Sequence, residues 1–256
     1  MNSPKRISLF LILSLLALGC AGGLPNSNKE YRVKQVIDGD TIELDGGERV
    51  RYLGLDTPET RKRQGETWVY APQPYAEKAK EFNRQLVEGR FIRLEFDIQK
   101  RDKYNRLLAY CFVGDTFVNA RILEEGLALL YTSSPNVKYV DLLVKKQQEA
   151  RQNNRGIWGE IQVIAPKDAQ AWLNQIVTVE GRVSSLYQSS KVSILNFSRS
   201  KFKAVIFKDD YPVFMSAGVS LSSYKGKTVR LSGKVREYKD NFEIIVRHPS
   251  SIEVMD

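Results

Sequence analysis

The chain has 256 residues, of which 39 are Lys or Arg, 30 are Asp or Glu and one is histidine, so its formal net charge is +9. With His248 as the only imidazole, a two-histidine metal site and a histidine-pair ribonuclease mechanism are excluded, and no nucleophile motif accompanies this histidine for a Ser-His-Asp triad. The length allows about two domains, and any chemistry must come from carboxylates and arginines, with or without a metal ion.

The N-terminus has the layout of an export signal. Two basic residues precede an apolar run of about a dozen residues, which is shorter than the roughly 20 needed to cross a bilayer. The run ends in Ala-Leu-Gly-Cys, which resembles the lipobox of bacterial lipoproteins. We expect a signal peptide over residues 1–20 with Cys20 as the lipidated residue, followed by a polar tether over residues 21–29. Cleavage at Ala21 or Gly22, giving a free secreted protein, and an uncleaved anchor stay open as alternatives.

The first half of the chain predicts strands followed by helices. An Asp-Gly-Gly turn at residues 45–47 separates strand-like runs and indicates a hairpin. The segment 60–74 is rich in proline and basic residues without sustained periodicity, so we expect a loop there. Strands are predicted over residues 31–37, 41–44, 49–55, 91–97 and 107–113, and helices over 75–87, 118–128 and 140–153. This order favours an α+β domain over residues 30–160 with a β-barrel or sheet.

After residue 163 the pattern becomes almost purely β. Short strands are predicted over residues 176–186, 191–197, 202–207, 228–238, 241–246 and 251–254, with one helical stretch at 213–217. The spacing predicts a second domain over residues 168–256, built as a small closed β-barrel.

The two cysteines and the charge distribution add two expectations. If Cys20 carries lipid, Cys111 has no disulfide partner, and its strand-like surroundings predict a small buried hydrophobic residue. Residues 165–256 hold 14 basic and 9 acidic residues, so the basic excess is concentrated there. A polyanionic partner and an ordinary basic surface both fit that excess.

Two acidic segments contain candidate catalytic residues. In VIDGDTIEL, Asp38 and Asp40 flank a glycine, and carboxylates two residues apart in an extended chain project to the same side. In RVRYLGLDTPET, Arg51, Asp56 and Glu59 fall within nine residues. If these segments meet, two acids could bind a hard cation, the arginine a phosphate oxygen and the glutamate a water molecule. Taken singly, the same residues also fit a turn, an exposed strand position and a cap before a proline.

A third segment, KRDKYNRLLAY, places two cations and an aromatic ring on one connection between strands. Lys103, Tyr104 and Arg106 are suited to holding phosphate groups, although a solvated basic hairpin tip has the same composition.

Together, in this order and spacing, the three segments resemble the staphylococcal nuclease (thermonuclease) family. The resemblance covers about residues 31–158 and implies an OB-fold barrel with packed helices that hydrolyses phosphodiester bonds of DNA and RNA with low sequence specificity, dependent on Ca²⁺, and leaves a 3′-phosphate. The resemblance implies catalytic roles for Arg51, Glu59 and Arg106. It implies that Asp40, Asp56 and the Thr57 carbonyl bind the calcium ion and that Asp38 supports this site. It also implies that Lys103, Tyr104 and Tyr131 bind the substrate.

The C-terminal domain resembles an OB-fold module that binds nucleic acid. Four aromatic residues could be stacking platforms or core residues: Tyr187, Phe202, Tyr238 and Phe242. The sequence thus predicts an exported, lipid-anchored, calcium-dependent nuclease facing the periplasm or the cell exterior, with DNA and RNA as partners and no protein partner inferred. The alternative is a non-catalytic, envelope-attached nucleic-acid-binding protein.

Overall fold

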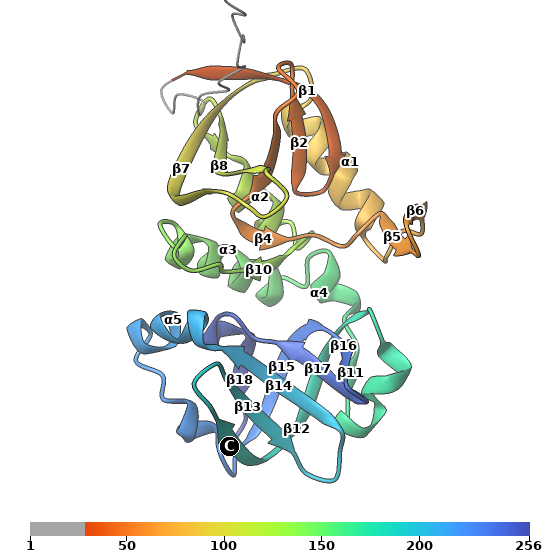
Figure 1. The fold of residues 1–256 in the computed structure, drawn as a ribbon, viewed down its shortest axis with the longest axis vertical. Helices are drawn as coiled ribbons and strands as arrows, with labels where there is room; N and C mark the ends of the chain where they lie inside the picture. Colours follow the sequence, from red (N-terminus) through yellow and green to blue (C-terminus); the bar gives the residue numbers. More distant parts are fainter. Residues whose placement is uncertain (1–28) are drawn as a thin grey trace, which may run out of the picture.

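The computed structural model describes residues 29–256, and these fold as two stacked units around separate hydrophobic cores (Figure 1). The predicted signal, Cys20 and the tether up to residue 28 lie outside the described residues. The fold is mostly β with several helices, as the sequence predicts. Within residues 29–256, no helix combines the length and apolar character that a membrane crossing requires.

The N-terminal unit, residues 30–160, is built on a closed β-barrel. Its elements are β1 (Glu30–Asp38), β2 (Thr41–Leu44), β3 (Arg49–Tyr52), β4 (Gly54–Asp56), β5 (Arg61–Gln64), β6 (Thr67–Tyr70), α1 (Ala76–Val87), β7 (Phe91–Arg101), β8 (Leu107–Val113), β9 (Thr116–Phe117), α2 (Val118–Glu124), β10 (Leu129–Tyr131), α3 (Val140–Gln152) and α4 (Ile157–Glu160). The sheet runs β3-β2-β1-β7-β8-β9, and a parallel pairing of β3 with β8 closes the ring. Strands β1, β2, β3, β7 and β8 therefore form the five-stranded ring of an OB-fold.

The barrel interior is filled by the apolar positions of these strands. Ile42, Val50, Leu94 and Leu107 are fully or almost fully buried. Cys111 on β8 is also buried, which confirms its predicted place in the core, and burial raises the pKa of its thiol. The closed ring leaves no exposed sheet edge among these strands.

Helix α1 supports the rim where β1 turns into β2. Its buried residues recur at helical spacing and include Ala79 and Asn83. Asn83 accepts a hydrogen bond from the Tyr52 hydroxyl (2.9 Å) and donates one to the carbonyl of Asp38 (3.2 Å). The helix thus fixes the backbone of the acidic turn that follows β1.

The segment 60–74, predicted to be a loop, instead contains the β5–β6 hairpin. The two strands pair from Arg61 with Tyr70 to Gln64 with Thr67, and Gly65 takes a positive φ of 60° in the turn between them. Nearly all of its side chains are exposed, including Trp68 and Tyr70. The apolar alternation that marks a half-buried strand is therefore missing, which explains why the prediction was wrong.

The C-terminal unit contains an eight-stranded sheet. Its elements are β11 (Val163–Ile164), η1 (Pro166–Trp172), β12 (Ile176–Gln188), β13 (Val192–Phe197), β14 (Phe202–Phe207), η2 (Lys208–Asp210), α5 (Tyr211–Ser216), η3 (Leu221–Tyr224), β15 (Thr228–Lys234), β16 (Arg236–Tyr238), β17 (Asn241–Ile245), η4 (Pro249–Ser251) and β18 (Ile252–Val254). The long strand β12 pairs with both β13 and β15, and β14 pairs with β17 in parallel. Seven strands lie in the order β16-β17-β14-β13-β12-β15-β18, and the eighth, β11, pairs with β12 off this path.

The four aromatic residues that the sequence suggested as stacking platforms divide into two kinds. Phe202 is buried and Phe242 packs against the core, so both act as core residues. Tyr187 and Tyr238 are more than half exposed. Only these two are therefore available for contact with a ligand.

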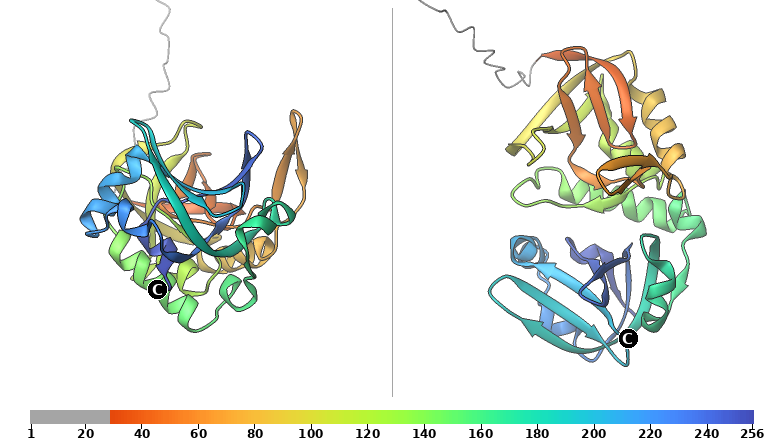
Figure 2. Two further views of the ribbon diagram at one scale, coloured as in Figure 1. Left: turned by 90° about the horizontal axis from the view of Figure 1, so that it is seen from below. Right: turned by 45° about the vertical axis from the view of Figure 1, so that its right-hand side comes forward.

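The two units meet along the face of the N-terminal unit that carries β4, β10 and α3 (Figures 1 and 2). Thr132 donates a hydrogen bond to the carbonyl of Arg247 (2.7 Å), and Arg151 on α3 forms an ion pair with Glu253 (3.7 Å). A third contact between the units is the hydrogen bond that the Gln73 side chain donates to the carbonyl of Asn174 (3.0 Å). These contacts place the C-terminal sheet directly opposite strands β4 and β10.

Candidate active site

The turn between β1 and β2 places Asp38 and Asp40 at the barrel rim. A Cβ atom at Gly39 would lie 2.7 Å from Cγ2 of Thr57 and 2.8 Å from Cβ of Ala79. The turn therefore needs a residue without a side chain, because only then can its backbone pack this closely against Thr57 and helix α1.

Asp40 is buried and held by Thr57. Its Oδ2 accepts hydrogen bonds from the backbone N–H of Thr57 (2.9 Å) and from the Thr57 hydroxyl (3.0 Å). The Thr41 hydroxyl donates to Oδ1 (3.1 Å). With an exposed fraction of 3%, this carboxylate has its position fixed by neighbouring donors.

Arg51 joins the two acidic segments. It lies opposite Thr41 in the β2–β3 register, which brings its guanidinium to the acidic turn. One nitrogen forms an ion pair with Asp40, and another binds Oδ1 of Asp56 at 2.6 Å. The structure thus confirms that the two segments meet, because a single half-buried guanidinium contacts both carboxylates.

Asp38 is the last residue of β1 and contacts the turn that carries Asp40. Its Oδ1 accepts a hydrogen bond from the backbone N–H of Asp40 (3.1 Å). Burial raises the pKa of Asp38, while the nearby guanidinium groups of Arg51 and Arg106 lower it. Asp38 therefore holds the backbone of Asp40 and places a third carboxyl group near Arg51.

Glu59 lies three residues after Asp56 at the edge of the same cluster. Its backbone is held on both sides by Gln73, whose Oε1 accepts from the Glu59 N–H (2.9 Å) and whose own N–H donates to the Glu59 carbonyl (2.9 Å). Partial desolvation in the crowded site, and then repulsion from Asp38 and Asp56, raise the pKa of the Glu59 carboxyl group. A carboxylate with a raised pKa is a stronger proton acceptor near neutral pH.

The loop between β7 and β8 contributes the remaining predicted cations. The Asp102 carboxylate accepts two hydrogen bonds from Arg106. The Arg106 side chain donates from Nε to Oδ2 (2.8 Å), and the Arg106 backbone N–H donates to Oδ1 (2.9 Å). Lys103 and Tyr104 are exposed at the tip, with the ammonium 5.0 Å from the ring centroid. Arg106 lies near enough to the acidic turn to lower the pKa of Asp38, and exposed Tyr104 lies beside its guanidinium.

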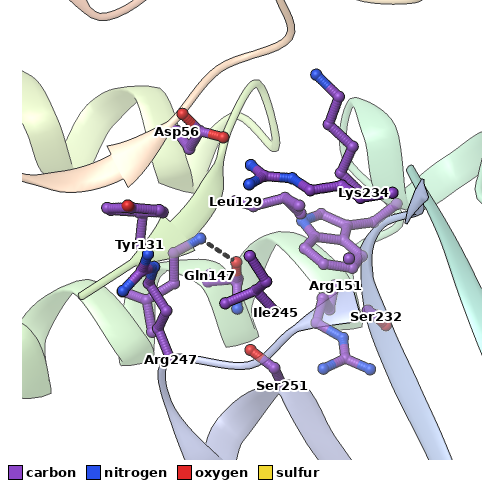
Figure 3. Close-up of a pocket in the computed structure, with 14 residues that line it drawn as sticks. Asp56, Leu129, Tyr131, Gln147, Arg151, Ser232, Lys234, Ile245, Arg247 and Ser251 are labelled. Carbon is purple, nitrogen blue, oxygen red and sulfur yellow. Dashed lines mark hydrogen bonds between the residues drawn. The ribbon is translucent and has the colours of Figure 1, made fainter. Parts of the chain in front are cut away.

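Tyr131 lies on β10, which pairs with β4 so that Leu129 is opposite Asp56. Its ring is covered by Arg247 of the C-terminal unit, with the guanidinium carbon 4.4 Å from the ring centroid. Figure 3 shows both side chains in a cleft between the two units that Asp56 and Lys234 also line. Tyr131 therefore lies beside the candidate site, in contact with a residue that the sequence did not single out.

The oxygen atoms of the cluster fit a hard divalent cation. Asp40 and Asp56 contact the same guanidinium, so both carboxylates belong to one cluster of oxygen donors. Within residues 29–256, no three Asp, Glu, His or Cys side chains gather as a metal cluster on their own. A metal here would need further oxygen ligands such as the Thr57 carbonyl and water, which is the chemistry that calcium prefers.

Comparison with known proteins decides the family. The family model described as "Staphylococcal nuclease homologue" matches residues 49–160, which include β3, β4 and the β7–β8 loop. The chain is 41% identical to a thermonuclease of Staphylococcus intermedius over 133 residues, covering 51% of this chain and 76% of that protein. The chain belongs to the staphylococcal nuclease family. A thermonuclease of Staphylococcus hyicus is 34% identical over 161 residues, with 59% and 92% covered, and endonuclease YncB of Bacillus subtilis is 40% identical over 148 residues, with 54% and 68% covered.

Staphylococcal nuclease family membership confirms the resemblance on which the site residues were chosen. The family model ends at residue 160, so the C-terminal unit is not part of the match. Sequence reasoning missed Asn83, Gln73 and Asp102, which hold the backbone or the arginine of the site, and Lys234, which faces it from the other unit. Asp102 lies inside the KRDKYNRLLAY segment but was given no role there. No local motif marks Asn83, Gln73 and Lys234, because they contact residues that are distant in sequence.

Proposed function

We propose that the protein is a metal-dependent nuclease that hydrolyses phosphodiester bonds in DNA and RNA with low sequence specificity. The observation that carries this proposal is the cluster in which Arg51 holds Asp40 and Asp56 together beside Glu59. The names of the matched thermonucleases and endonuclease support the same activity.

In this proposal the two arginines bind the oxygens of the scissile phosphate. Arg51 and Arg106 are fixed by carboxylates, so their donors are preorganised for the negative charge that develops in the transition state. Glu59 takes a proton from a water molecule as that water attacks phosphorus. The bond from phosphorus to the 5′ oxygen breaks, and this oxygen takes a proton from a water molecule, which leaves a 3′-phosphate and a 5′-hydroxyl group.

Asp40, Asp56 and the Thr57 carbonyl would hold the Ca²⁺ ion, with Asp38 supporting the turn that carries Asp40. When bound, such an ion neutralises phosphate charge and polarises the phosphorus–oxygen bonds. Lys103 and Tyr104 would bind a neighbouring phosphate, because both are exposed beside Arg106.

We also propose that the C-terminal unit is an OB-like barrel that binds nucleic acid. Its strand pairing supports this, since its third and fifth long strands, β14 and β17, are parallel, like β3 and β8 in the N-terminal ring. Exposed Tyr187 and Tyr238, together with the excess of basic residues, would supply stacking and charge.

Export and lipid anchoring through Cys20 complete the proposal and rest on the sequence alone. The mature protein would then face the periplasm or the cell exterior. Fractionation of producing cells tests the anchor: the wild type should be in the membrane fraction and Cys20→Ser should not. Equal distribution of the two proteins would exclude a lipid anchor at this residue.

The activity is tested by cleavage of single- and double-stranded DNA and of RNA with calcium, with magnesium and with chelator. We expect calcium-dependent cleavage that falls by about 10²-fold or more in Glu59→Gln and in Arg106→Ala. Glu66→Gln, an exposed glutamate in the β5–β6 turn, is the matched control and should cut normally. Loss of cleavage under every condition, with DNA binding retained, would favour the non-catalytic nucleic-acid-binding protein instead.

A further inference from the structure

The cleft between the two units presents cations of the C-terminal unit to the candidate active site. Strand β15 ends at Lys234, and Arg236 begins β16 two residues later. Both residues line the cleft, and so do Arg247 and, on the opposite wall, Asp56 and Tyr131. Figure 3 shows the Lys234 side chain extending from its strand toward the side of the cleft on which Asp56 lies. The C-terminal unit thus contributes cationic side chains at the edge of the acidic cluster.

Among the cationic residues that line the cleft, Lys234 is the one with a half-buried side chain and no direct partner in the described part of the chain. Its side chain is half-buried, and within residues 29–256 it makes no hydrogen bond and no ion pair. Burial lowers the pKa of its ammonium group, and the carboxylates of Asp56 and Glu59 raise it from a distance. A half-buried ammonium without a direct counter-ion is unfavourable, because it has lost water without gaining a partner. An anionic group between Lys234 and the site would supply that partner.

The backbone holds Lys234 in this position. Lys234 lies opposite Ile176 in the β12–β15 ladder, at the end of an unbroken run of paired residues. At the preceding Gly233, a Cβ atom would lie 2.4 Å from Cγ2 of Ile244. The close packing of β15 on β17 therefore depends on glycine there, and it fixes the direction in which the next side chain leaves the strand.

The two units are also joined next to the proposed catalytic glutamate. The Gln73 side chain accepts from the Glu59 N–H with Oε1 and donates to the Asn174 carbonyl with Nε2. Asn174 in turn donates its N–H to the carbonyl of Val235, the neighbour of Lys234. A short chain of hydrogen bonds therefore connects the backbone of Glu59 with the backbone beside Lys234.

We propose that this cleft is a nucleic-acid subsite, in which Lys234 binds a phosphate of the substrate strand adjacent to the one being cleaved, and Arg236 binds the strand farther along. This rests on the proposed nuclease function, because the direction of the strand is set by the phosphate held by Arg51 and Arg106. The ligand is the phosphodiester backbone of a single strand long enough to reach both units. Figure 2 supports such a path, since the β5–β6 and β16–β17 hairpins project from the same side of the molecule.

The subsite is tested by binding to the full chain in chelator, where a fluorescent single strand of about 20 nucleotides stays intact. We expect Lys234→Gln to weaken binding by about 3- to 10-fold and to reduce the slope of log affinity against log salt by about 0.7. Lys234→Arg should bind like the wild type, because it retains the charge. Lys225→Gln removes an exposed lysine of the same unit outside the cleft and should leave the slope unchanged.

Turnover of a substrate with a single phosphodiester bond distinguishes two roles of Lys234. In one role Lys234 binds a phosphate of a long strand, and in the other it acts on the carboxylates of the acidic cluster. In the subsite interpretation, Lys234→Gln raises KM for the long strand and leaves kcat and KM for the short substrate unchanged. An equal loss on both substrates would overturn the proposal, because Lys234 would then act on Asp56 and Glu59. Equal salt slopes for Lys234→Gln and Lys225→Gln, with both variants folded, would also overturn it. Because the binding assay needs no cleavage, an inactive wild type would refute the nuclease function alone.

Discussion

Asn83 allows a direct test of how helix α1 supports the acidic turn. Its side chain is fully buried, and it joins the Tyr52 hydroxyl to the carbonyl of Asp38. Replacing Asn83 with alanine leaves a buried hydroxyl and a carbonyl without their partner. Each such group costs about 1–3 kcal/mol, so for two groups we expect the free energy of unfolding to fall by about 2–6 kcal/mol.

The two contributions can be separated by a double-mutant cycle. Tyr52→Phe removes the hydroxyl itself, so Asn83→Ala in that background leaves only the Asp38 carbonyl unpaired. The cost of Asn83→Ala should therefore be about 1–3 kcal/mol smaller in Tyr52→Phe than in the wild type. Urea unfolding followed by circular dichroism measures all four proteins, with the slope m expected to stay constant.

The same variant should also affect catalysis. Because Asn83 binds the backbone of Asp38, its loss frees the turn that carries Asp40, and we expect kcat to fall by about 10-fold while the fold is retained. Identical costs of Asn83→Ala in the two backgrounds would refute the hydrogen-bond reasoning. An unchanged kcat in a destabilised Asn83→Ala protein would show that the helix supports the fold and not the site.

Two further predictions concern close packing and pH. Gly39→Ala should lower the free energy of unfolding by about 1–3 kcal/mol and reduce cleavage, because its Cβ would push Thr57 away from Asp40. Gly46→Ala, in a turn with open space around it, is the control, and equal thermal unfolding of the two variants would contradict the prediction. Burial lowers the pKa of His248 to about 4 from an ordinary value of 6.5. Between these two pH values the unfolded chain binds more protons than the folded chain. The free energy of unfolding should therefore fall as the pH drops through this window, by at most about 3 kcal/mol. Urea midpoints measured across this range should vary less with pH in His248→Asn, and parallel pH profiles for the two proteins would exclude His248 as the cause.

Most of the fold could be predicted because burial leaves a periodic record in the sequence. The strands of the barrel and the helix over residues 75–87 place apolar residues on one face, and the structure confirms them. The β5–β6 hairpin is solvated on nearly all sides, so its residues carry no such record. Aromatic residues in the C-terminal strands were ambiguous for a related reason, since Phe202 is buried and Tyr238 exposed within similar local patterns.

The site was predictable to the extent that its residues are close in sequence. Arg51, Asp56 and Glu59 belong to one segment, and the barrel register brings Asp40 to them. Lys234 reaches the site only through the packing of one unit against the other, and Gln73 reaches it through hydrogen bonds to Glu59, 14 residues away in sequence. Tertiary placement of this kind has no short-range signature, so such residues become visible only in three dimensions.

The amide of Gln73 has a consequence for the modular use of this chain. One side chain completes the backbone hydrogen bonding of Glu59 and also fastens the C-terminal unit. Exchanging that unit for another binding module would leave the amide group with a missing acceptor beside the proposed water-activating residue. In fusion or domain-swapping designs, a carbonyl at the position of Asn174 would preserve this link, whereas its removal would leave the exposed amide to bind water beside Glu59.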